Sequence, residues 1–236
     1  MDLAKLREKN LQITKQKLKE SIHEDNLIIQ SINNYEELNK ILNTLVKRLR
    51  EWYELYNPEF SKETYDNESF VKYLKKEKSE MGGNLKKEDV DIIFELKEKI
   101  KELYDLEHTE EKYLDSLMDS SCKNLKTVAG TLIGARLIGK AGSLKKLALM
   151  PASTIQLLGA EKALFRHIKT KAKCPRHGLI HEHPFILQSK NQFRGKIARQ
   201  FADKISLAVK IDYFKGEFKG DKLKKEMEDN IRKIKG

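Results

Sequence analysis

The clearest pattern of apolar and polar positions lies in the first half of the chain. Between residues 35 and 56, apolar side chains recur at alternating steps of three and four residues, with Glu, Lys, Asn and Arg between them. This spacing is a heptad seam sustained over three heptads, and it predicts a helix that packs along another helix. The seam consists of Tyr35, Leu38, Leu42, Leu45, Leu49, Trp52 and Tyr56.

A second apolar period predicts the partner helix. It runs from about Lys87 to Val128 and opens with Val90, Ile93, Leu96, Ile100 and Leu103. Asn57-Pro58 ends the first helix, because proline disfavours a helical residue before it. Between the helices, residues 65–78 predict a short helix, and Met81-Gly82-Gly83-Asn84 predicts a turn. We therefore expect an antiparallel coiled-coil hairpin over residues 25–128, after a helical lead-in over residues 1–24.

The hairpin has two interpretations that the seam cannot separate. It is either a stalk or a surface through which two copies pair as a homodimer. In the second interpretation the contacts would come from Tyr35, Leu38, Leu42, Leu45, Leu49 and Trp52.

From Gly130 onward small residues cluster, which favours closely packed short helices. Helices are predicted from Pro151, where proline suits a first turn, then over 160–169 and over 190–214, with a basic loop over 171–181. The long helix should bury Phe193, Ile197, Phe201, Ile205, Ala208 and Val209. Residues 221–235 form a lysine-rich tail that we expect to be helical. Since no stretch alternates with a β period, the predicted fold is all-α, with a compact second domain over 129–236.

Charge divides the chain at the same place. Residues 130–236 hold 24 Lys and Arg against nine Asp and Glu, whereas the remainder has a net charge of −4. A basic surplus confined to half of a chain indicates a polyanionic partner, and nucleic acid fits better than a membrane, because no long amphipathic helix carries these charges. No apolar run reaches the roughly 18 residues of a membrane span, and the start of the chain has no secretory signal. The two distant cysteines imply no disulfide, so we expect a cytoplasmic protein.

One block is specific enough to identify a family. The run Met150-Pro151-Ala152-Ser153-Thr154-Ile155-Gln156-Leu157-Leu158-Gly159-Ala160-Glu161-Lys162-Ala163-Leu164-Phe165-Arg166, preceded by Gly142-Ser143-Leu144, closely resembles the Nop domain signature. Cys174-Pro175-Arg176-His177-Gly178 resembles the basic loop of that family, and Arg194-Gly195-Lys196-Ile197-Ala198-Arg199 its late basic helix. Residues 25–30 and 49–53 resemble the coiled coil that precedes the domain in archaeal members. The resemblance covers about residues 24–234.

The resemblance implies a scaffold and not an enzyme. Similar proteins recognise a kink-turn RNA together with a small kink-turn-binding protein, and the archaeal forms hold box C/D guide RNAs that direct ribose 2′-O-methylation of RNA, including rRNA. In those particles the methyltransferase is fibrillarin, which docks on a separate N-terminal domain of the scaffold. This chain departs from the pattern because its coiled coil starts within the first thirty residues. Fibrillarin is therefore expected as a partner only if its docking domain is supplied elsewhere.

The candidate RNA-binding residues combine charge, spacing and family position. Arg176 and Arg199 match family positions that contact RNA; Lys162, Arg166 and Lys169 fall on one helical face. The full set is Lys162, Arg166, Lys169, Lys171, Arg176, His177, Arg194, Lys196 and Arg199. The residues expected to meet the partner protein are Pro151, Ala152, Ile155 and Gln156. Leu164 and Phe165 are expected in the core.

Three alternatives stay beside this interpretation. Cys174, His177, His181 and His183 have the residue types of a zinc site, but the family loop requires no metal and we expect none. An enzyme is disfavoured, since the chain has no Gly-rich nucleotide loop and no carboxylate pair in its basic block, and we expect no cofactor. A purely structural coiled coil with only nonspecific affinity for RNA is the stronger rival.

Overall fold

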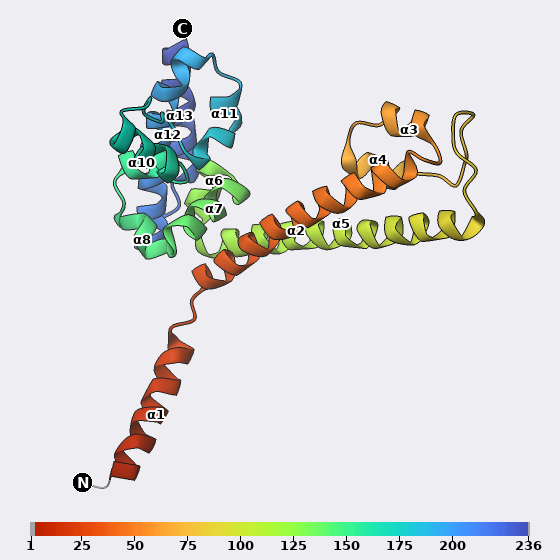
Figure 1. Cartoon of the computed structure of the whole chain (residues 1–236). Helices are drawn as coiled ribbons and strands as arrows, with labels where there is room; N and C mark the ends of the chain where they lie inside the picture. Colours follow the sequence, from red (N-terminus) through yellow and green to blue (C-terminus); the bar gives the residue numbers. More distant parts are fainter. Residues whose placement is uncertain (1–2, 236) are drawn as a thin grey trace. The chain divides into compact units, whose positions relative to one another are not determined.

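The computed structural model describes residues 3–235, and in these residues it consists of helices joined by loops, without a β-strand. The all-α prediction is therefore confirmed. Figure 1 shows the helices in chain order, with the long pair α2 (Glu24–Tyr53) and α5 (Lys87–Ser121) side by side. The first helix, α1 (Leu3–Glu20), keeps nearly all of its described side chains exposed. None of the described helices combines the length and the apolar character that crossing a membrane requires.

The chain divides into two compact units. One comprises residues 33–113, and the other joins residues 3–32 to residues 114–235. The sequence placed the borders after residues 24 and 128, whereas the structural division falls within α2 and α5. The predicted second hairpin helix also ends earlier than expected, because it breaks at Cys122. The separate helix α6 (Lys123–Ala129) then packs on the C-terminal helices.

The hairpin unit, residues 33–113, is built on antiparallel contacts between α2 and α5. Asn34 donates to Glu110 at 2.7 Å and Asn39 donates to Glu107 at 2.9 Å, so ascending numbers on one helix meet descending numbers on the other. The buried side of α2 consists of Leu38, Leu42, Val46, Leu49 and Tyr53. Leu45 lies only at the margin of this core and Trp52 is 38% exposed, so the predicted seam is correct at some positions and displaced at others.

An aromatic cluster packs around Tyr53, at the end of α2 in the hairpin unit. Tyr53 is 1% exposed and makes edge contacts with Tyr56, Phe60, Phe70 and Phe94 at centroid distances of 5.9–6.4 Å. Two short helices bring in two of these rings: Phe60 lies on α3 (Pro58–Glu63) and Phe70 on α4 (Asn67–Tyr73). Only α4 was predicted, with wider bounds. Asn57 and Asp66 start the two helices, because each side chain accepts a backbone N–H of the first turn.

Arg50 holds the loop between these short helices in place. Its guanidinium donates to the backbone carbonyls of Thr64 at 2.7 Å, Tyr65 at 3.1 Å and Asp66 at 3.0 Å. It also lies over the ring of Phe70, 4.1 Å from the centroid. The carbonyls of a loop outside regular secondary structure have few backbone N–H partners. The planar guanidinium, with five N–H donors, can satisfy several of them at once. Arg50 therefore fixes the backbone from which α4 starts.

The second unit is organised around α12 (Asn191–Tyr213). Its inward residues Ile197, Phe201, Ile205, Ala208 and Val209 are all fully buried, as predicted, while Phe193 is only half-buried. Helices α6, α8 (Leu144–Leu149) and α9 (Ala152–Leu157) pack on it, and α7 (Thr131–Ala141) packs on α6 and α8. At Gly134, on α7, an added Cβ would come within 2.8 Å of Met118. The small residues of this half therefore permit the close helix packing that the sequence predicted.

The C-terminal helix is a core element. We predicted residues 221–235 as a lysine-rich tail, and α13 (Gly220–Lys235) indeed forms, but it packs on α12 and α6. Leu223, Met227 and Ile231 lie one turn apart on one face and are at most 8% exposed. The predicted helix is confirmed, and these three apolar positions give it a buried stripe beneath its lysines.

A half-buried carboxylate ties α12 to the start of α6. Asp212 accepts the backbone N–H groups of Asn124 at 3.1 Å and Leu125 at 2.8 Å, and also the side-chain amide of Asn124 at 2.7 Å. Burial raises the pKa of Asp212, while these hydrogen bonds oppose the shift. The contact satisfies amide groups that every helix leaves free in its first turn.

Candidate nucleic-acid interface

The basic loop after α10 (Glu161–Thr170) is attached to the end of α9. Gly178 donates its backbone N–H to Gln156 at 2.7 Å, and Leu179 donates to Leu158 at 2.8 Å. The side chain of Gln156 donates to the carbonyl of Arg176, also at 2.7 Å. An added Cβ on Gly178 would lie 2.0 Å from the carbonyl oxygen of Leu158, which explains the glycine. The segment between residues 159 and 178 thus leaves α9 and returns to it.

Arg176 lies at the end of this loop with its side chain exposed. Its aliphatic part faces Gly195, where an added Cβ would be 3.6 Å from its Cδ, and its guanidinium reaches the carbonyl of Asn191 at a long 3.4 Å. The residue therefore lies beside the first turns of α12. Lys196 and Arg199 follow on α12, three residues apart and both exposed. The geometry brings Arg176 next to the basic segment of α12, as the sequence interpretation requires.

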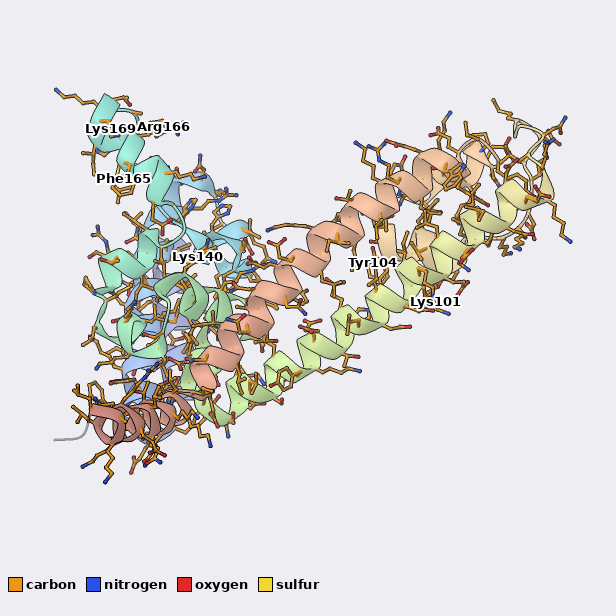
Figure 2. All side chains as sticks on the ribbon, turned by 60° about the horizontal axis from the view of Figure 1, so that its bottom comes forward. Lys101, Tyr104, Lys140, Phe165, Arg166 and Lys169 are labelled. Atoms are coloured by element: carbon orange, nitrogen blue, oxygen red, sulfur yellow. The ribbon has the colours of Figure 1, made fainter. Side chains whose placement is uncertain are left out.

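Helix α10 carries the other predicted cations and buries none of its residues. Lys162, Arg166 and Lys169 are exposed along it, and Figure 2 shows the helix projecting from the rest of its unit. Lys171 is exposed at the C-cap with a left-handed φ of 53°. Such a cap ends the helix and turns the chain back toward α9.

The same helix exposes apolar side chains. Phe165 is 61% exposed and Ile168 is 66% exposed, three residues apart and interleaved with the cations. We expected Phe165 in the core, which is wrong, whereas Leu164 is half-buried. Exposed aromatic and aliphatic side chains on a basic helix are unusual for a merely solvated face and indicate a contact surface. The sequence signal that we missed is that α10 has no second apolar face with which it could pack on a core.

Arg194 occupies a different environment from its neighbours. Its Nε donates to the carbonyl of Ser189 at 2.9 Å and its Nη2 to that of Leu187 at 3.0 Å. These carbonyls end α11 (Pro184–Leu187), so the guanidinium serves as a cap inside the unit. The structure thus places Arg194 in a structural role, unlike Lys196 and Arg199, although all three belong to one basic motif.

His177 is half-buried and stacks on His181, with ring centroids 4.2 Å apart. Burial lowers its pKa, and the charges of His181, Arg194 and Arg176 lower it further. A neutral imidazole can stack or donate a hydrogen bond but does not neutralise a phosphate. The RNA contact predicted for His177 would therefore be a stack or a hydrogen bond and not an ion pair.

The residues considered for zinc are not gathered around one point. Cys174 is exposed in the loop, whereas His183 starts α11 by accepting the N–H of Phe185 and packs 4.4 Å from the ring of Phe201. Burial, and secondarily Lys224, lowers the pKa of His183 to about 4. Among the described residues, no group of three or more His, Cys, Asp or Glu is arranged to hold a metal ion.

The four residues predicted to meet a partner protein differ in their exposure to solvent. Pro151 is exposed before α9, and Ala152 and Gln156 are half-buried. Ile155 is fully buried, since α9 packs this side on α12. Direct contact of Ile155 with a partner is therefore ruled out in this conformation, and its role is to hold α9 on the unit.

The predicted dimerisation residues are likewise divided. Leu38, Leu42 and Leu49 are at most 7% exposed inside the core of the hairpin unit. Tyr35 and Leu45 are half-buried and Trp52 is 38% exposed. A second copy could touch only the last three without opening the hairpin, so the contact set predicted from the seam is too wide.

The model of one family, Nop, described as a snoRNA-binding domain with fibrillarin, matches residues 34–82 and 72–233. An uncharacterized NOP5 family protein of Methanocaldococcus jannaschii is 41% identical over 237 residues, covering 89% of this chain and 57% of the relative. Nucleolar protein 58 of Schizosaccharomyces pombe is 38% identical over 215 residues, covering 80% of this chain and 42% of the relative.

These relatives are longer proteins. Nucleolar protein 56 of Dictyostelium discoideum is 36% identical and matches 93% of this chain but 47% of its own length. The chain thus spans about half the length of the curated relatives it matches. Among solved structures, a chain from the crystal structure of a fibrillarin/Nop5p complex is similar with a TM-score of 0.62 and 26% identity, covering 97% of this chain and 77% of that chain.

Proposed function

The chain belongs to the Nop family, and from this premise we propose that it is a non-catalytic scaffold for a box C/D-type ribonucleoprotein. It binds a kink-turn guide RNA together with the small protein that recognises the kink-turn, and so supports RNA-guided ribose 2′-O-methylation. The residues that carry the RNA contact are Lys162, Arg166, Lys169, Lys171, Arg176, Lys196 and Arg199.

The single observation that carries the proposal is a set of exposed cations on α10, on the loop after it and on α12. Among the described residues, Arg166, Arg176 and Arg199 are exposed and take part in no ion pair. Elsewhere in the same unit, lysines are neutralised: Lys126 pairs with Asp115 and Asp119, and Lys204 pairs with Glu226. Clustered cations without local carboxylates favour a polyanion, because phosphate contacts release condensed counterions.

The two kinds of surface on α10 suit a composite partner. A bent RNA presents crowded phosphates and unstacked bases, which cations and planar groups can contact. Phe165 and Ile168 lie between the cations and would meet apolar surface on the kink-turn-binding protein or an unstacked base. Neither the RNA nor its protein alone would satisfy both kinds of side chain, so we expect weak binding to RNA alone and tight binding to their complex.

Arg176 is the residue best prepared for a precise contact. Two hydrogen bonds fix its loop to the end of α9. The side chain of Gln156 donates to the carbonyl of Arg176, and Gly178 donates its N–H to the carbonyl of Gln156. A preorganised arginine loses less conformational entropy on binding, and its fork matches phosphate or a base edge. Pro151 and Ala152, at the accessible end of α9, are the remaining candidates for the partner protein.

The proposal is tested by gel-shift titration of the full chain on a kink-turn RNA at several salt concentrations, with and without the kink-turn-binding protein. We expect marked tightening when that protein is present, and an affinity for the RNA that falls with salt. A straight duplex of equal length serves as the matched control and should gain nothing from the added protein. Equal affinity for both RNAs under all conditions would contradict specific recognition.

A second candidate function is a structural protein that pairs with a copy of itself and has only nonspecific affinity for RNA. Tyr35, Leu45 and Trp52, the partly accessible seam residues, are the observation in its favour. Sedimentation of the wild-type chain and of Trp52→Ser measures the homodimer, and the duplex control above measures the specificity. Fibrillarin remains a proposed partner only where its docking domain is supplied, and methyl transfer by this chain without fibrillarin would overturn the non-catalytic assignment.

A further inference from the structure

An open, polar cavity lies within the hairpin unit, lined by residues between 35 and 111. It has a volume of about 480 Å³, opens to solvent, and is lined by residues of α2, α4 and α5 and of the loop before α4. Three tyrosines line it, Tyr35, Tyr65 and Tyr104, and Figure 2 shows Tyr104 between α2 and α5. Carboxylates line it as well, including Glu107 and Glu111, whereas its described lining contains no lysine or arginine. Its size is within the range of small-molecule sites.

The floor of the cavity is an ordered series of side-chain hydrogen bonds. Asn67 donates to Asn43 at 3.1 Å, Asn43 donates to Asn39 at 2.7 Å, and Asn39 donates to Glu107 at 2.9 Å. Arg50 begins the series, since its Nε donates to the side-chain amide oxygen of Asn67 at 3.2 Å. Since each donor points the same way along the series, it ends on the Glu107 carboxylate. Such polar networks cost stability relative to apolar packing, although a satisfied network is rigid.

Glu107 itself is the unusual member. It is 8% exposed, yet among the described residues it takes part in no ion pair, and it accepts a hydrogen bond from the neutral amide of Asn39. A carboxylate buried to this degree ordinarily has a cationic partner or a metal. No metal-binding group of His, Cys, Asp or Glu is found among the described residues. The lining histidine, His108, interacts with the Glu107 charge but pairs with Glu68 at 3.0 Å, so a ligand with an organic cation would supply a further counter-charge.

The rest of the lining suits such a cation. The aromatic faces of Tyr35, Tyr65 and Tyr104 can attract ammonium groups through their quadrupoles. Burial raises the pKa of Tyr104 to about 12, and the charges of Glu107, Glu68 and Asp66 add to the shift, which shows the negative potential inside the cavity. Glu111, exposed at the rim, would meet a second positive group of the same ligand.

We propose that this cavity of the hairpin unit binds a small linear polyamine, with one ammonium group against Glu107 and a second toward Glu111. The site lies wholly within residues 33–113, so it goes beyond the RNA proposal and does not depend on it. A bound polyamine would supply a further counter-charge to Glu107 and would join α2, α4 and α5 around one ligand.

The test is calorimetric titration of spermidine into the full chain without RNA, at constant ionic strength. Glu107→Gln removes the buried charge and keeps the shape, and it should weaken binding about tenfold. Glu95→Gln is the matched control, because Glu95 is exposed on α5 outside the cavity, and it should bind as the wild type does. Glu111→Gln changes an exposed residue that the fold does not need, and it should weaken binding by a smaller factor.

NMR locates the ligand independently, since the side-chain amides of Asn39 and Asn43 should shift on titration of the wild-type chain. The proposal is overturned if spermidine binds no better than sodium chloride of equal ionic strength. Equal weakening by Glu95→Gln and Glu107→Gln would also overturn it, because that result indicates diffuse attraction to an acidic surface. If Glu107→Gln unfolds the unit, the comparison of Glu111→Gln with Glu95→Gln decides in the same way.

Discussion

Arg50→Met is the substitution whose consequence the structure allows us to work out most fully. Methionine keeps the aliphatic stem but removes the guanidinium that contacts three carbonyls at 2.7–3.1 Å and the ring of Phe70 at 4.1 Å. Each such bond contributes about 1 kcal/mol net, and stacking over the ring adds about 0.5–1 kcal/mol. The carbonyls lie in an accessible loop and can turn to water afterwards. We therefore expect the free energy of unfolding of the hairpin unit to fall by about 3–4 kcal/mol.

Urea denaturation followed by tryptophan fluorescence measures this loss specifically. The chain has one tryptophan, Trp52, and it lies on α2 two residues from the substitution, within the hairpin unit. Arg48→Met is the matched control: Arg48 makes an exposed pair with Glu51 at 2.7 Å, which should contribute less than about 1 kcal/mol. If Arg50→Met were no less stable than Arg48→Met, the role assigned to Arg50 in holding the loop would be wrong.

Further predictions concern the other unit. Arg194→Met should lower its free energy of unfolding by about 1–2 kcal/mol, because the end of α11 loses its cap; unchanged stability, measured by hydrogen exchange of α11 and α12, would return Arg194 to the RNA-binding set. Because the folded-state pKa of His183, about 4, lies below the usual value of 6.5, its neutral form stabilises the fold above pH 6.5 and that stability is lost as the pH falls toward 4. His183→Asn keeps a capping group but cannot titrate, so hydrogen exchange should show a flatter pH dependence between these values; the same slope as wild type would exclude His183 as the cause. Phe165→Ser with Ile168→Ser should leave stability within about 0.5 kcal/mol yet weaken the complex with RNA and the kink-turn-binding protein, and a strongly destabilised double variant would show that α10 is packed, contrary to its exposure.

The heptad pattern predicted the hairpin but not which residues its core contains. The buried positions of α2 follow steps of four, four, three and four residues from Leu38 to Tyr53, close to the natural period of a straight helix. The predicted seam followed the 3.5-residue period of a supercoil. It therefore included Leu45 and Trp52, whereas the residues buried in the structure are Val46 and Tyr53. The aromatic cluster around Tyr53 also depends on α3, which the sequence pattern did not reveal.

The basic site was predictable in its outline and not in its individual roles. Charge clustering and the Nop signature located α10, Arg176 and the start of α12. No sequence pattern distinguishes Arg194 from Arg199, because the difference arises from the carbonyls that end α11. The buried stripe of α13 was readable from the spacing of Leu223, Met227 and Ile231, but the lysines between them concealed it.

The central claim is that Arg176 and Arg199 contact RNA in a complex with the kink-turn-binding protein. The most direct measurement is the dissociation constant of that complex at one fixed salt concentration for Arg176→Ala, Arg199→Ala and Lys225→Ala. Lys225 is an exposed cation on α13 of the same unit, outside the proposed surface, and it controls for loss of one charge. The account predicts a loss of about 1–3 kcal/mol for each arginine variant and no comparable loss for the lysine variant. Three equal dissociation constants, or losses shared equally by all three variants, would contradict it.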